Sequence, residues 1–418
     1  MRNDVLDTLD PRELGRDLKA ARIRRGLTQE QAAQLIGVAR TTLIAIEQGT
    51  RRLLPKELTG LAHGYGKDVG EFVRRRPHVD AFQPQFRGPT SPTEEGQELI
   101  ARHVQTFEDL CRSYLELEEL TSSPLVRHYP PEYRTAGLPA EEAAETVALE
   151  ERNRLRLGDG PVAMLRDVLE NDIGLRVFYL DLPSNYSEIY VYSDQLGGCL
   201  AANRRHPVER RRWSLIHGLG HFEAHRQRSV VEVDGSYLRR PDHERFAEAF
   251  ACFFLMPTTG LTRRFNEIRQ STGKVTLVDL CILAHTYGVS MEALTRRLED
   301  LRLISAGKWE EWKRSGLKVH ELRAQAGIDI FPDRLDRYPL RYRLLAVDAL
   351  DRGLITEGQF ARFLEVSRLE ARRQANLLRR IDDDAGEEPI ESAPNGQLMS
   401  EHPAGEEEKH AERYSARS

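Results

Sequence analysis

The sequence predicts a mainly α-helical chain with a small central α+β domain, and three observations support this fold class. Short amphipathic segments with helix caps fill both ends of the chain. Runs of β-branched and aromatic residues with the length of strands lie between residues 173 and 205. The chain has 418 residues, 40% hydrophobic and 30% charged, and this length suggests several globular domains.

The composition excludes several classes of protein. No stretch approaches the roughly 18 consecutive apolar residues of a membrane-spanning helix, and the first residues lack the basic and then apolar order of a signal peptide. We therefore expect a cytoplasmic protein without a membrane partner. The cysteines form no C-x-x-C pair, so they indicate neither a disulfide framework nor a cysteine zinc site. The four cysteines are Cys111, Cys199, Cys252 and Cys281.

Charge is distributed unevenly along the chain. Residues 1–76 hold 15 Lys and Arg against 10 Asp and Glu, whereas residues 382–418 hold 3 against 11. The basic N-terminal region is therefore a candidate for binding a polyanion. The acidic C-terminal region has too few apolar residues to fold, and we predict a disordered tail over residues 382–418.

The first 76 residues are predicted to form five short helices. Thr28 is a good N-cap, and Gly37 and Gly49 end the two helices that follow it, so residues 28–49 predict a helix, a tight turn and a helix. Together with the local positive charge, this motif indicates a DNA-binding domain. A five-helix interaction module that does not bind DNA is the alternative.

The segment GLTQEQAAQLIGVARTTLIAIEQGTR resembles the XRE family of helix-turn-helix domains. The resemblance covers about 65 residues and implies that the third helix lies in the major groove of DNA. By the same likeness, Arg22 and Glu47 form an internal ion pair. The resemblance implies DNA contacts from Thr28, Gln29, Arg40, Thr41, Thr42, Arg51 and Arg52.

A linker and a long helix are predicted after this domain. Residues 78–97 are rich in proline and glycine without apolar periodicity, which predicts a linker. Residues 95–120 then predict an amphipathic helix that packs on a neighbouring domain or on a second copy of the chain. Its apolar side is predicted to hold Leu99, Val104, Phe107, Leu110, Tyr114 and Leu117.

Two histidines in RRRWSLIHGLGHFEAHR, residues 210–226, have the spacing of a metal site. His217 and His221 stand four apart on a predicted helix, so about 400° of rotation places both side chains on one face, one turn apart. This geometry suits chelation of one zinc ion, although such pairs also occur in ordinary cores. Downstream, HERFAEAFACFFLMP predicts a second helix with Glu244 at its start.

The two helices, with the predicted strand CLAANRR before them, resemble the ImmA/IrrE metallopeptidase family. The likeness spans about 165 residues and implies a zinc ion held by His217, His221 and Glu244, with water in the fourth position. Two core histidines beside a glutamate, without metal, are the alternative. His225 is predicted to lie next to the metal ligands without binding the metal, or on the surface. His206 and His243 are predicted to lie on the surface. The family pattern is matched at Arg211, Arg212, His217, Leu219, Gly220, His221, Glu244, Ala247, Phe250, Ala251, Leu255, Met256 and Pro257.

The chain departs from this family at Gly218, where the family pattern has glutamate. Peptide hydrolysis by a zinc enzyme needs a base that accepts the proton of the metal-bound water, and glycine cannot serve. Losing a positioned base should slow hydrolysis about 10²–10⁴-fold. Glu248, one helical turn after Glu244, is the best substitute that the sequence offers. Gly220 lies in the same helical turn as Gly218. The two glycines indicate either sequence drift after loss of selection or room for a bound group.

Further helices are predicted to close the central domain and to form a C-terminal unit. The C-terminal unit resembles the small helical module often attached to ImmA/IrrE peptidases. The predicted divisions are a helix-turn-helix domain over 1–76, a linker and connecting helix over 77–137, a zincin-like metallopeptidase domain over 138–305, a helical module over 306–381 and a tail over 382–418.

These observations favour a dimeric, DNA-binding transcriptional regulator in which a peptidase-like domain senses a ligand instead of cleaving. The predicted partners are operator DNA and a small molecule, a peptide or a repressor protein, and the predicted cofactor is Zn²⁺. An active zinc endopeptidase that cleaves an XRE-type repressor is the alternative. A scaffold domain that binds no metal is a third possibility.

Overall fold

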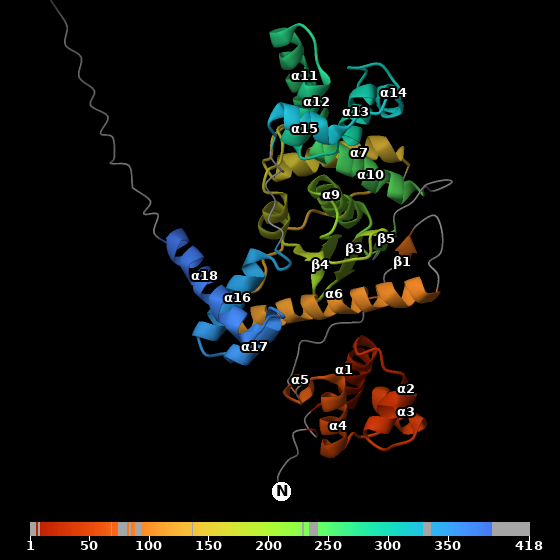
Figure 1. The fold of residues 1–418 in the computed structure, drawn as a ribbon, viewed down its shortest axis with the longest axis vertical. Coiled ribbons are helices and arrows are strands. Elements are labelled where there is room, and N and C mark those ends of the chain that lie inside the picture. Colours follow the sequence, from red (N-terminus) through yellow and green to blue (C-terminus); the bar gives the residue numbers. More distant parts are fainter. Residues whose placement is uncertain are drawn as a thin grey trace, which may run out of the picture.

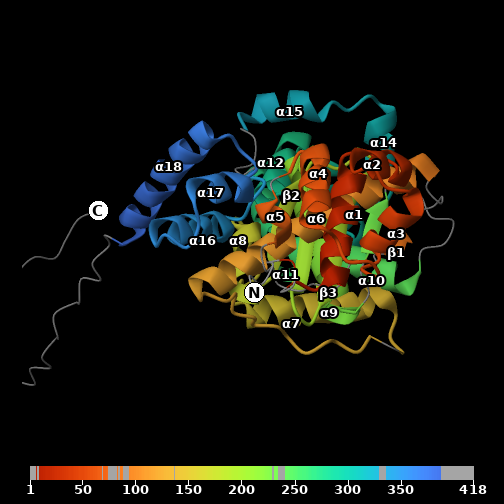
Figure 2. The ribbon, with the colours of Figure 1, turned by 90° about the horizontal axis from the view of Figure 1, so that it is seen from below.

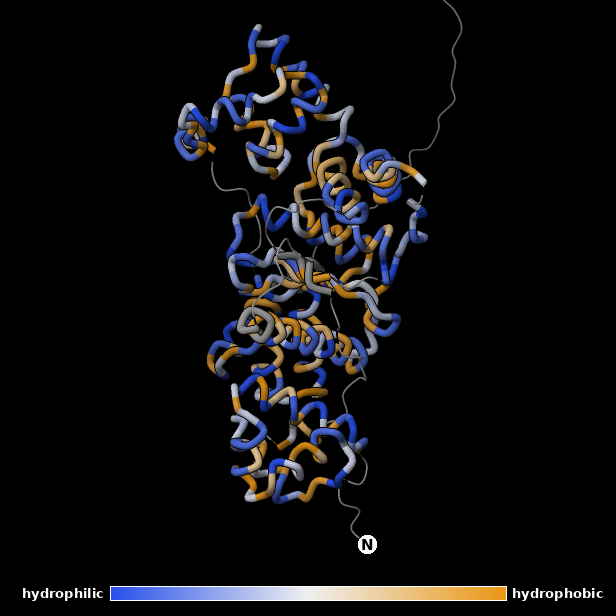
Figure 3. The backbone as a smooth tube through the Cα atoms, turned by 90° about the vertical axis from the view of Figure 1, so that its right-hand side faces the viewer, coloured by the Kyte–Doolittle hydropathy of each residue, from blue (hydrophilic) through white to orange (hydrophobic). Residues whose placement is uncertain are grey.

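The computed structural model describes residues 6, 9–67, 69–73, 82, 85–87, 94–135, 137–227, 230–233, 241–328 and 336–386. It contains a helical N-terminal domain, a long connecting helix, a central sheet with helices on both faces, and a group of C-terminal helices (Figure 1). The predicted fold class is confirmed. Along the chain, apolar and polar stretches alternate as expected for amphipathic helices (Figure 3).

Among the described residues, no single helix is both long enough and apolar enough to span a membrane. One pair of helices, α12 (Leu277–Tyr287) and α13 (Met291–Asp300), meets both conditions together, by length and composition alone, with a bend of 102° between them.

The N-terminal domain has the predicted five helices. Thr28 caps the second of them in a capping box, because its side chain accepts a hydrogen bond from the Gln31 N–H and the Gln31 side chain accepts one from the Thr28 N–H. The expected ion pair is also present, with Arg22 Nε 2.6 Å from Glu47 Oε1, and both side chains are buried. The five helices are α1 (Pro11–Arg24), α2 (Gln29–Leu35), α3 (Arg40–Glu47), α4 (Pro55–Tyr65) and α5 (Gly70–Val73).

The connecting helix α6 (Glu94–Thr121) confirms the long helix predicted over residues 95–120. Ile100, Phe107 and Tyr114 recur every seven residues and are fully buried, so they define its buried stripe. Leu99 was predicted to belong to that stripe, but 44% of it is exposed. The physical reason is its position one residue before Ile100, which turns its side chain about 100° away from the stripe.

Ion pairs hold the N-terminal domain against one side of α6 (Figures 1 and 2). Arg24 at the end of α1 lies 2.6 Å from Asp109, and Arg112 lies 3.2 Å from Asp17. The packing of this domain on α6 therefore includes two charge-assisted contacts between otherwise separate cores.

The central sheet has five strands in the order β1-β5-β3-β4-β2. β3 runs antiparallel to β4 and β5, whereas β2 is parallel to β4 and β1 is parallel to β5. The strands predicted between residues 173 and 205 are confirmed as β2, β3 and β4. The strands are β1 (Gln85–Arg87), β2 (Arg176–Leu180), β3 (Tyr186–Ser193), β4 (Gly197–Asn203) and β5 (Val230–Val233).

Strand β1 lies inside the segment that was predicted as a linker. That prediction is wrong for residues 85–87, which pair in parallel with β5. Three residues are too few for a period-two pattern to show, and the surrounding prolines conceal the strand.

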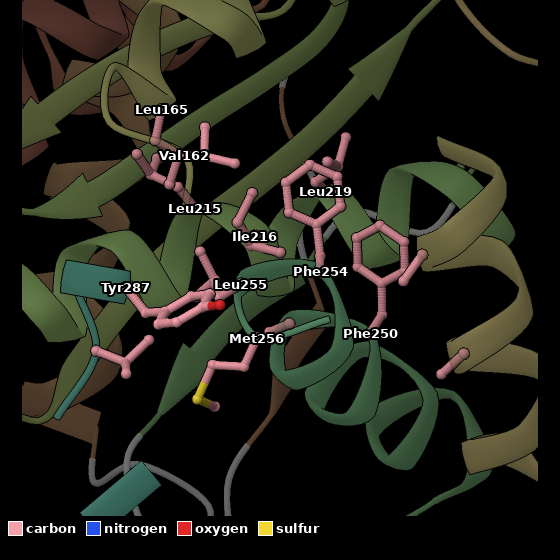
Figure 4. Packing of buried hydrophobic residues seen from close by; sticks show 14 of the residues in the cluster. Val162, Leu165, Leu215, Ile216, Leu219, Phe250, Phe254, Leu255, Met256 and Tyr287 are labelled. Atoms are coloured by element: carbon pink, nitrogen blue, oxygen red, sulfur yellow. The ribbon is translucent and has the colours of Figure 1, made fainter. Parts of the chain in front are cut away.

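Helices cover both faces of the sheet. Successive residues of a strand point to opposite faces, so alternate residues join different cores. Val177, Tyr179 and Leu200 pack with helices α7 (Ala140–Arg154), α9 (Val208–Ala224) and α10 (Asp242–Leu255). Phe178 and Ala201 pack with α6 on the other face. The core on the α9 face of the sheet is continuous between α9 and α10, where Leu219 lies beside Phe254 (Figure 4).

The remaining helices extend these two cores. Trp309 on α14 packs with the core of the α9 face, so α14 and α15 join the central domain rather than the C-terminal helices. Tyr342 on α16 meets Tyr114 of α6 edge-on, with ring centroids 5.4 Å apart. The additional helices are α8 (Leu165–Asp167), the π-helix Val168–Ile173, α11 (Thr258–Thr272), α14 (Lys308–Arg314), α15 (Val319–Ala326), α16 (Leu340–Asp351), α17 (Glu357–Phe363) and α18 (Arg368–Gly386).

Residues 382–386 were predicted to belong to a disordered tail, but they are helical. Helix α18 continues to Gly386, so the prediction is wrong for residues 382–386, and residues 387–418 lie outside the described part. The amphipathic start of α18 packs Ala371, Ala375 and Leu378 into the core, and helix propagation beyond a packed start costs little.

We predict that Gly15→Ala destabilises the N-terminal domain. A β-carbon at this position would lie 2.5 Å from the Ile46 carbonyl oxygen and 2.7 Å from that of Glu47, so α1 and α3 would have to separate. The expected loss is about 1–3 kcal/mol of unfolding free energy, which denaturant melting of the wild-type and variant chains would measure. Gly70→Ala, where a β-carbon meets nothing within 4 Å, is the control. Equal stability of the two variants would contradict the close contact.

Candidate metal centre

Helix α9 is anchored at its start by two buried arginines. Arg211 donates to the carbonyl oxygen of His206 at 2.7 Å. Arg212 donates to the carbonyl oxygens of Gly288 and Ala163, each at 3.2 Å. These bonds fix the rotation of α9 about its axis, and therefore the direction in which its histidines point. Arg211 and Arg212 therefore have a structural role, which is to orient α9.

The structure brings His217, His221 and Glu244 together. One ligand atom of each lies within 4.8 Å of the others, and all three residues are buried. His217 Nε2 is 3.6 Å from Glu244 Oε2, and His221 Nε2 is 3.6 Å from Glu244 Oε1. Two imidazoles and one carboxylate are the donor set of an open zinc site, so this cluster could hold the metal with a further position available.

The electrostatics of the three groups also suit a cation. Burial lowers the pKa of His221 to about 4, so its ring is neutral at pH 7 and its nitrogens can act as ligands. Burial acts to raise the pKa of Glu244, but its close contacts with His217 and His221 outweigh burial and hold that pKa below its ordinary value. Glu244 is therefore an anion in a buried site, which favours a cation beside it.

The hydrogen bonding of His221 is a second indication that the residues fit a metal. Its ring is fully buried, yet neither Nδ1 nor Nε2 has a hydrogen-bond partner among the described residues. Buried polar atoms in native proteins nearly always have partners. A metal ligated by His221 would supply the missing interaction for one of its nitrogens.

Glu188 on β3 also belongs to the site, although the sequence analysis did not single it out. His217 donates from Nδ1 to Glu188 Oε1 at 2.9 Å, which leaves Nε2 facing Glu244. Burial raises the pKa of Glu188, whereas its contact with His217 acts in the opposite direction. The available signal was an acidic residue within YSEIYVYS, a strand whose first six residues are all buried.

The two glycines of α9 are positions of close packing. A β-carbon on Gly218 would overlap Leu200 Cδ2 and lie 3.3 Å from Glu188 Oε1. A β-carbon on Gly220 would lie 3.1 Å from the Ala247 Cα on α10. Side chains of the protein itself fill the space beside Gly218, so the expectation of room for a bound group there is wrong.

The histidines around the site are more buried than predicted. His206 was predicted on the surface, but it is buried, with Nε2 2.9 Å from the Ser184 carbonyl oxygen. His243 was also predicted on the surface, but its side chain is only 18% exposed and its Nε2 lies 3.4 Å from Glu244 Oε1. The rings of His225 and His243 are 5.8 Å apart. Both wrong predictions arose because neighbouring elements cover these residues.

A groove lies between α9, α10 and α13, and the three metal ligands are not among its lining residues. It encloses about 770 Å³ and has Trp213, Cys252 and Phe253 among its apolar lining residues. Trp213 precedes His217 by one turn, and Glu248 follows Glu244 by one turn. The substitute base proposed from sequence therefore lines this groove, and the volume falls in the range of small-ligand pockets.

Five of the residues predicted to contact DNA lie at the start of α2 or α3, and the other two lie between α3 and α4. Arg40 and Thr41 are exposed, and Arg40 Nη2 is 3.5 Å from Gln29 Oε1. Gln29 also donates to Glu47 at 3.2 Å, which links it to the buried Arg22 pair. Thr28 and Arg52 are exposed and Thr42 is half-buried, whereas Arg51 is held by Glu57 through two bonds of 2.8 and 2.9 Å.

Comparisons with known proteins match the two domains that contain these residues. Residues 18–72 match a helix-turn-helix family, and residues 170–299 match the IrrE N-terminal-like domain, a peptidase family. Matches among solved structures include Bacillus thuringiensis PlcR in complex with the peptide PapR7 and DNA, at 10% identity over 90% of this chain and 97% of that chain. Its TM-score of 0.18 is too low to carry an argument. The comparison with curated proteins found no match. Both sequence resemblances are thereby confirmed.

We predict that Zn²⁺ stabilises the wild-type chain but not the His221→Ala variant. At zinc concentrations near 100 times Kd, binding adds about 2.7 kcal/mol, which corresponds to roughly 5–10 °C in the thermal midpoint of a domain of this size. Calorimetry with zinc and with a chelator would measure the difference. His320→Ala, at an exposed position on α15, should respond like the wild type. An equal shift for His221→Ala would remove this residue from the ligand set.

Proposed function

Because this chain joins an XRE-type helix-turn-helix domain to an IrrE N-terminal-like domain, we propose that it is a transcriptional regulator whose peptidase-like domain senses a ligand. The observation that carries the proposal is Gly218. The general base is missing from α9, and Leu200 and Glu188 fill the adjoining space. The domain therefore has a site suited to a metal without the usual group for peptide hydrolysis.

In this proposal His217, His221 and Glu244 hold zinc, and the groove with Trp213 and Glu248 admits the ligand. When bound, the zinc would supply a Lewis acid at this cluster of ligands. The apolar floor of the groove, with charged residues around it, suits a small amphipathic molecule or a short peptide. A repressor protein remains the partner expected if the domain cleaves, with Glu248 as the base.

The N-terminal domain is proposed to bind operator DNA through the front of α3. Arg40, Thr41 and Thr42 would face base edges, while Thr28, Gln29 and Arg52 would contact the backbone. Arg51 would also contact a phosphate, although Glu57 neutralises part of its charge. Two copies of the chain would place two such helices about 34–36 Å apart on adjacent half-sites.

Helix α6 is the proposed connection between the two functions. On one face of the sheet, α9 packs against Leu200 of β4, and on the other, α6 packs against Ala201 of the same strand. Asp109 and Arg112 of α6 then contact α1 of the DNA-binding domain. A shift of α9 on ligand binding would thus reach the DNA-binding domain through packed elements.

We predict that zinc or a chelator changes DNA affinity in the wild type without any proteolysis. Genomic footprinting would first identify the operator. Binding to that DNA would then be measured with and without zinc, while candidate repressor proteins are incubated with the chain and inspected for cleavage. Cleavage by the wild type that is abolished in His217→Ala would overturn the sensor in favour of an endopeptidase.

We predict that Arg40→Ala weakens operator binding about 5–150-fold, the effect of losing about 1–3 kcal/mol from a bidentate contact. Fluorescence anisotropy with a labelled operator would measure it. Arg16→Ala removes the same charge from α1, where Arg16 lies 4.0 Å from Glu13, and should have a smaller effect. Equal losses of affinity in both variants would mean that Arg40 contributes only to the nonspecific electrostatic attraction between the domain and DNA.

We predict that the double variant Asp109→Ala, Arg112→Ala uncouples the two domains. Both ion pairs to α1 would be lost, while the zinc ligands, on the opposite face of the sheet, remain intact. Zinc affinity should stay at the wild-type value, and the effect of zinc on DNA affinity should fall. An unchanged effect of zinc on DNA binding would exclude this route.

A further inference from the structure

Gly218 on α9 and Glu188 on β3 lie on either side of one small volume. A β-carbon on Gly218 would approach Glu188 Oε1 to 3.3 Å before any further atom of the side chain was added. Leu200 bounds the same space from β4. A longer acidic side chain at 218 would therefore meet the carboxylate that β3 already provides.

The burial of Glu188 is not explained by stability. The residue is 2% exposed, and its Oε2 has no hydrogen-bond partner among the described residues. A buried carboxylate with an unsatisfied oxygen costs free energy, and replacing such groups by neutral ones is often neutral or stabilising. Stability alone does not account for a carboxylate here, so the contact of its other oxygen carries the argument.

The hydrogen bond between Glu188 and His217 explains why a carboxylate is favoured at position 188. Glu188 Oε1 accepts the Nδ1 hydrogen of His217, so it selects the tautomer in which Nε2 is free to ligate. The same Nε2 is the atom that lies near Glu244. Carboxylates that bind the second nitrogen of a ligating histidine orient the ring and increase metal affinity.

We propose that Glu188 is the positioning carboxylate of this metal centre and that it occupies the volume which an acidic side chain at position 218 would need. The acidic group beside the metal ligands is thus supplied by β3 and not by position 218 of α9. The inference rests on the proposed function in that His217 is taken as a ligand. It adds that restoring glutamate at 218 alone cannot rebuild a peptidase site.

The shared volume is tested by a double-mutant cycle on the metal-free full-length chain. Thermal unfolding is compared for the wild type, Glu188→Ala, Gly218→Glu and the double variant, with Gly218→Ala as a control for the overlap with Leu200. We expect Gly218→Glu to lower the thermal midpoint by clearly more than Gly218→Ala in the wild-type background. With Glu188→Ala present, much of that additional loss should disappear. Additive losses would overturn the shared volume.

The positioning role is tested by metal affinity and by the cobalt spectrum. We expect Glu188→Ala to bind zinc about 10–100-fold more weakly than the wild type in chelator competition. Glu188→Gln should lose less, because its amide oxygen can still accept the Nδ1 hydrogen. The visible bands of the Co²⁺-loaded chain should shift in Glu188→Ala and be largely restored in Glu188→Gln.

A matched control separates these effects from loss of a buried charge. Glu223 is a fully buried glutamate on α9, the helix of His217, and the charges that act on it are those of Glu151, Arg154 and Arg226. Glu223→Gln should leave zinc affinity and the cobalt spectrum unchanged. Wild-type affinity in Glu188→Ala, or an equal loss in Glu223→Gln, would overturn the positioning role.

The proposed sensor and the proposed role of Glu188 can be overturned independently. A wild-type chain that binds no zinc would defeat the proposed sensor, while the metal-free cycle would still decide whether residues 188 and 218 share one volume. A wild-type chain that binds zinc with full affinity in Glu188→Ala would leave the sensor intact and defeat the inference.

Discussion

The close approach of α9 to its two neighbours is the constraint on which the central domain depends. On one side, Gly218 brings the helix against Leu200 and Glu188 of the sheet, and on the other, Gly220 brings it against Ala247 of α10. Any larger residue would push one of these elements away. Because the helix is this close to both, His217 reaches β3 and α10 at the same time, and a buried cluster of donor atoms forms between three separate elements. The glycines therefore build the site, at a cost in helix propensity of about 1 kcal/mol each.

The opposite face of the sheet is held as firmly, and by a different kind of contact. Arg176 of β2 forms a buried ion pair of 2.7 Å with Glu118 of α6, and Arg341 of α16 also reaches Glu118. Removing one partner of such a pair leaves a buried charge unpaired and is strongly destabilising. The sheet, α6 and the C-terminal helices are thus expected to behave as one body.

How much of this could be predicted from sequence depends on the range of the interaction. The spacing of His217 and His221 follows from the helical period alone, and Thr28 marks its helix through local capping. Glu188 meets His217 only because β3 pairs with β4 beneath α9, a contact that no local pattern encodes. Strand β1 is defined by pairing with β5 and has almost no pattern of its own. Leu99 shows the limit within a helix, since an error of one residue rotates a side chain from core to solvent.

The free energy of the contact between the DNA-binding domain and α6 determines how strongly ligand binding can change the orientation of that domain. Its two ion pairs to α6 are partly exposed, and pairs of this kind contribute about 0–1 kcal/mol each after screening. A contact this weak can be made or broken by a modest difference in ligand affinity between two arrangements of the chain. Complete switching from 1% to 99% of one arrangement would require about 5.5 kcal/mol. A single metal or ligand bound at 100 times its Kd supplies at most about half of that, even if it binds one arrangement only. Ligand binding at one centre would therefore bias the orientation of the DNA-binding domain, and a complete switch would need the combined effect of two centres on a two-fold operator or of metal and ligand together.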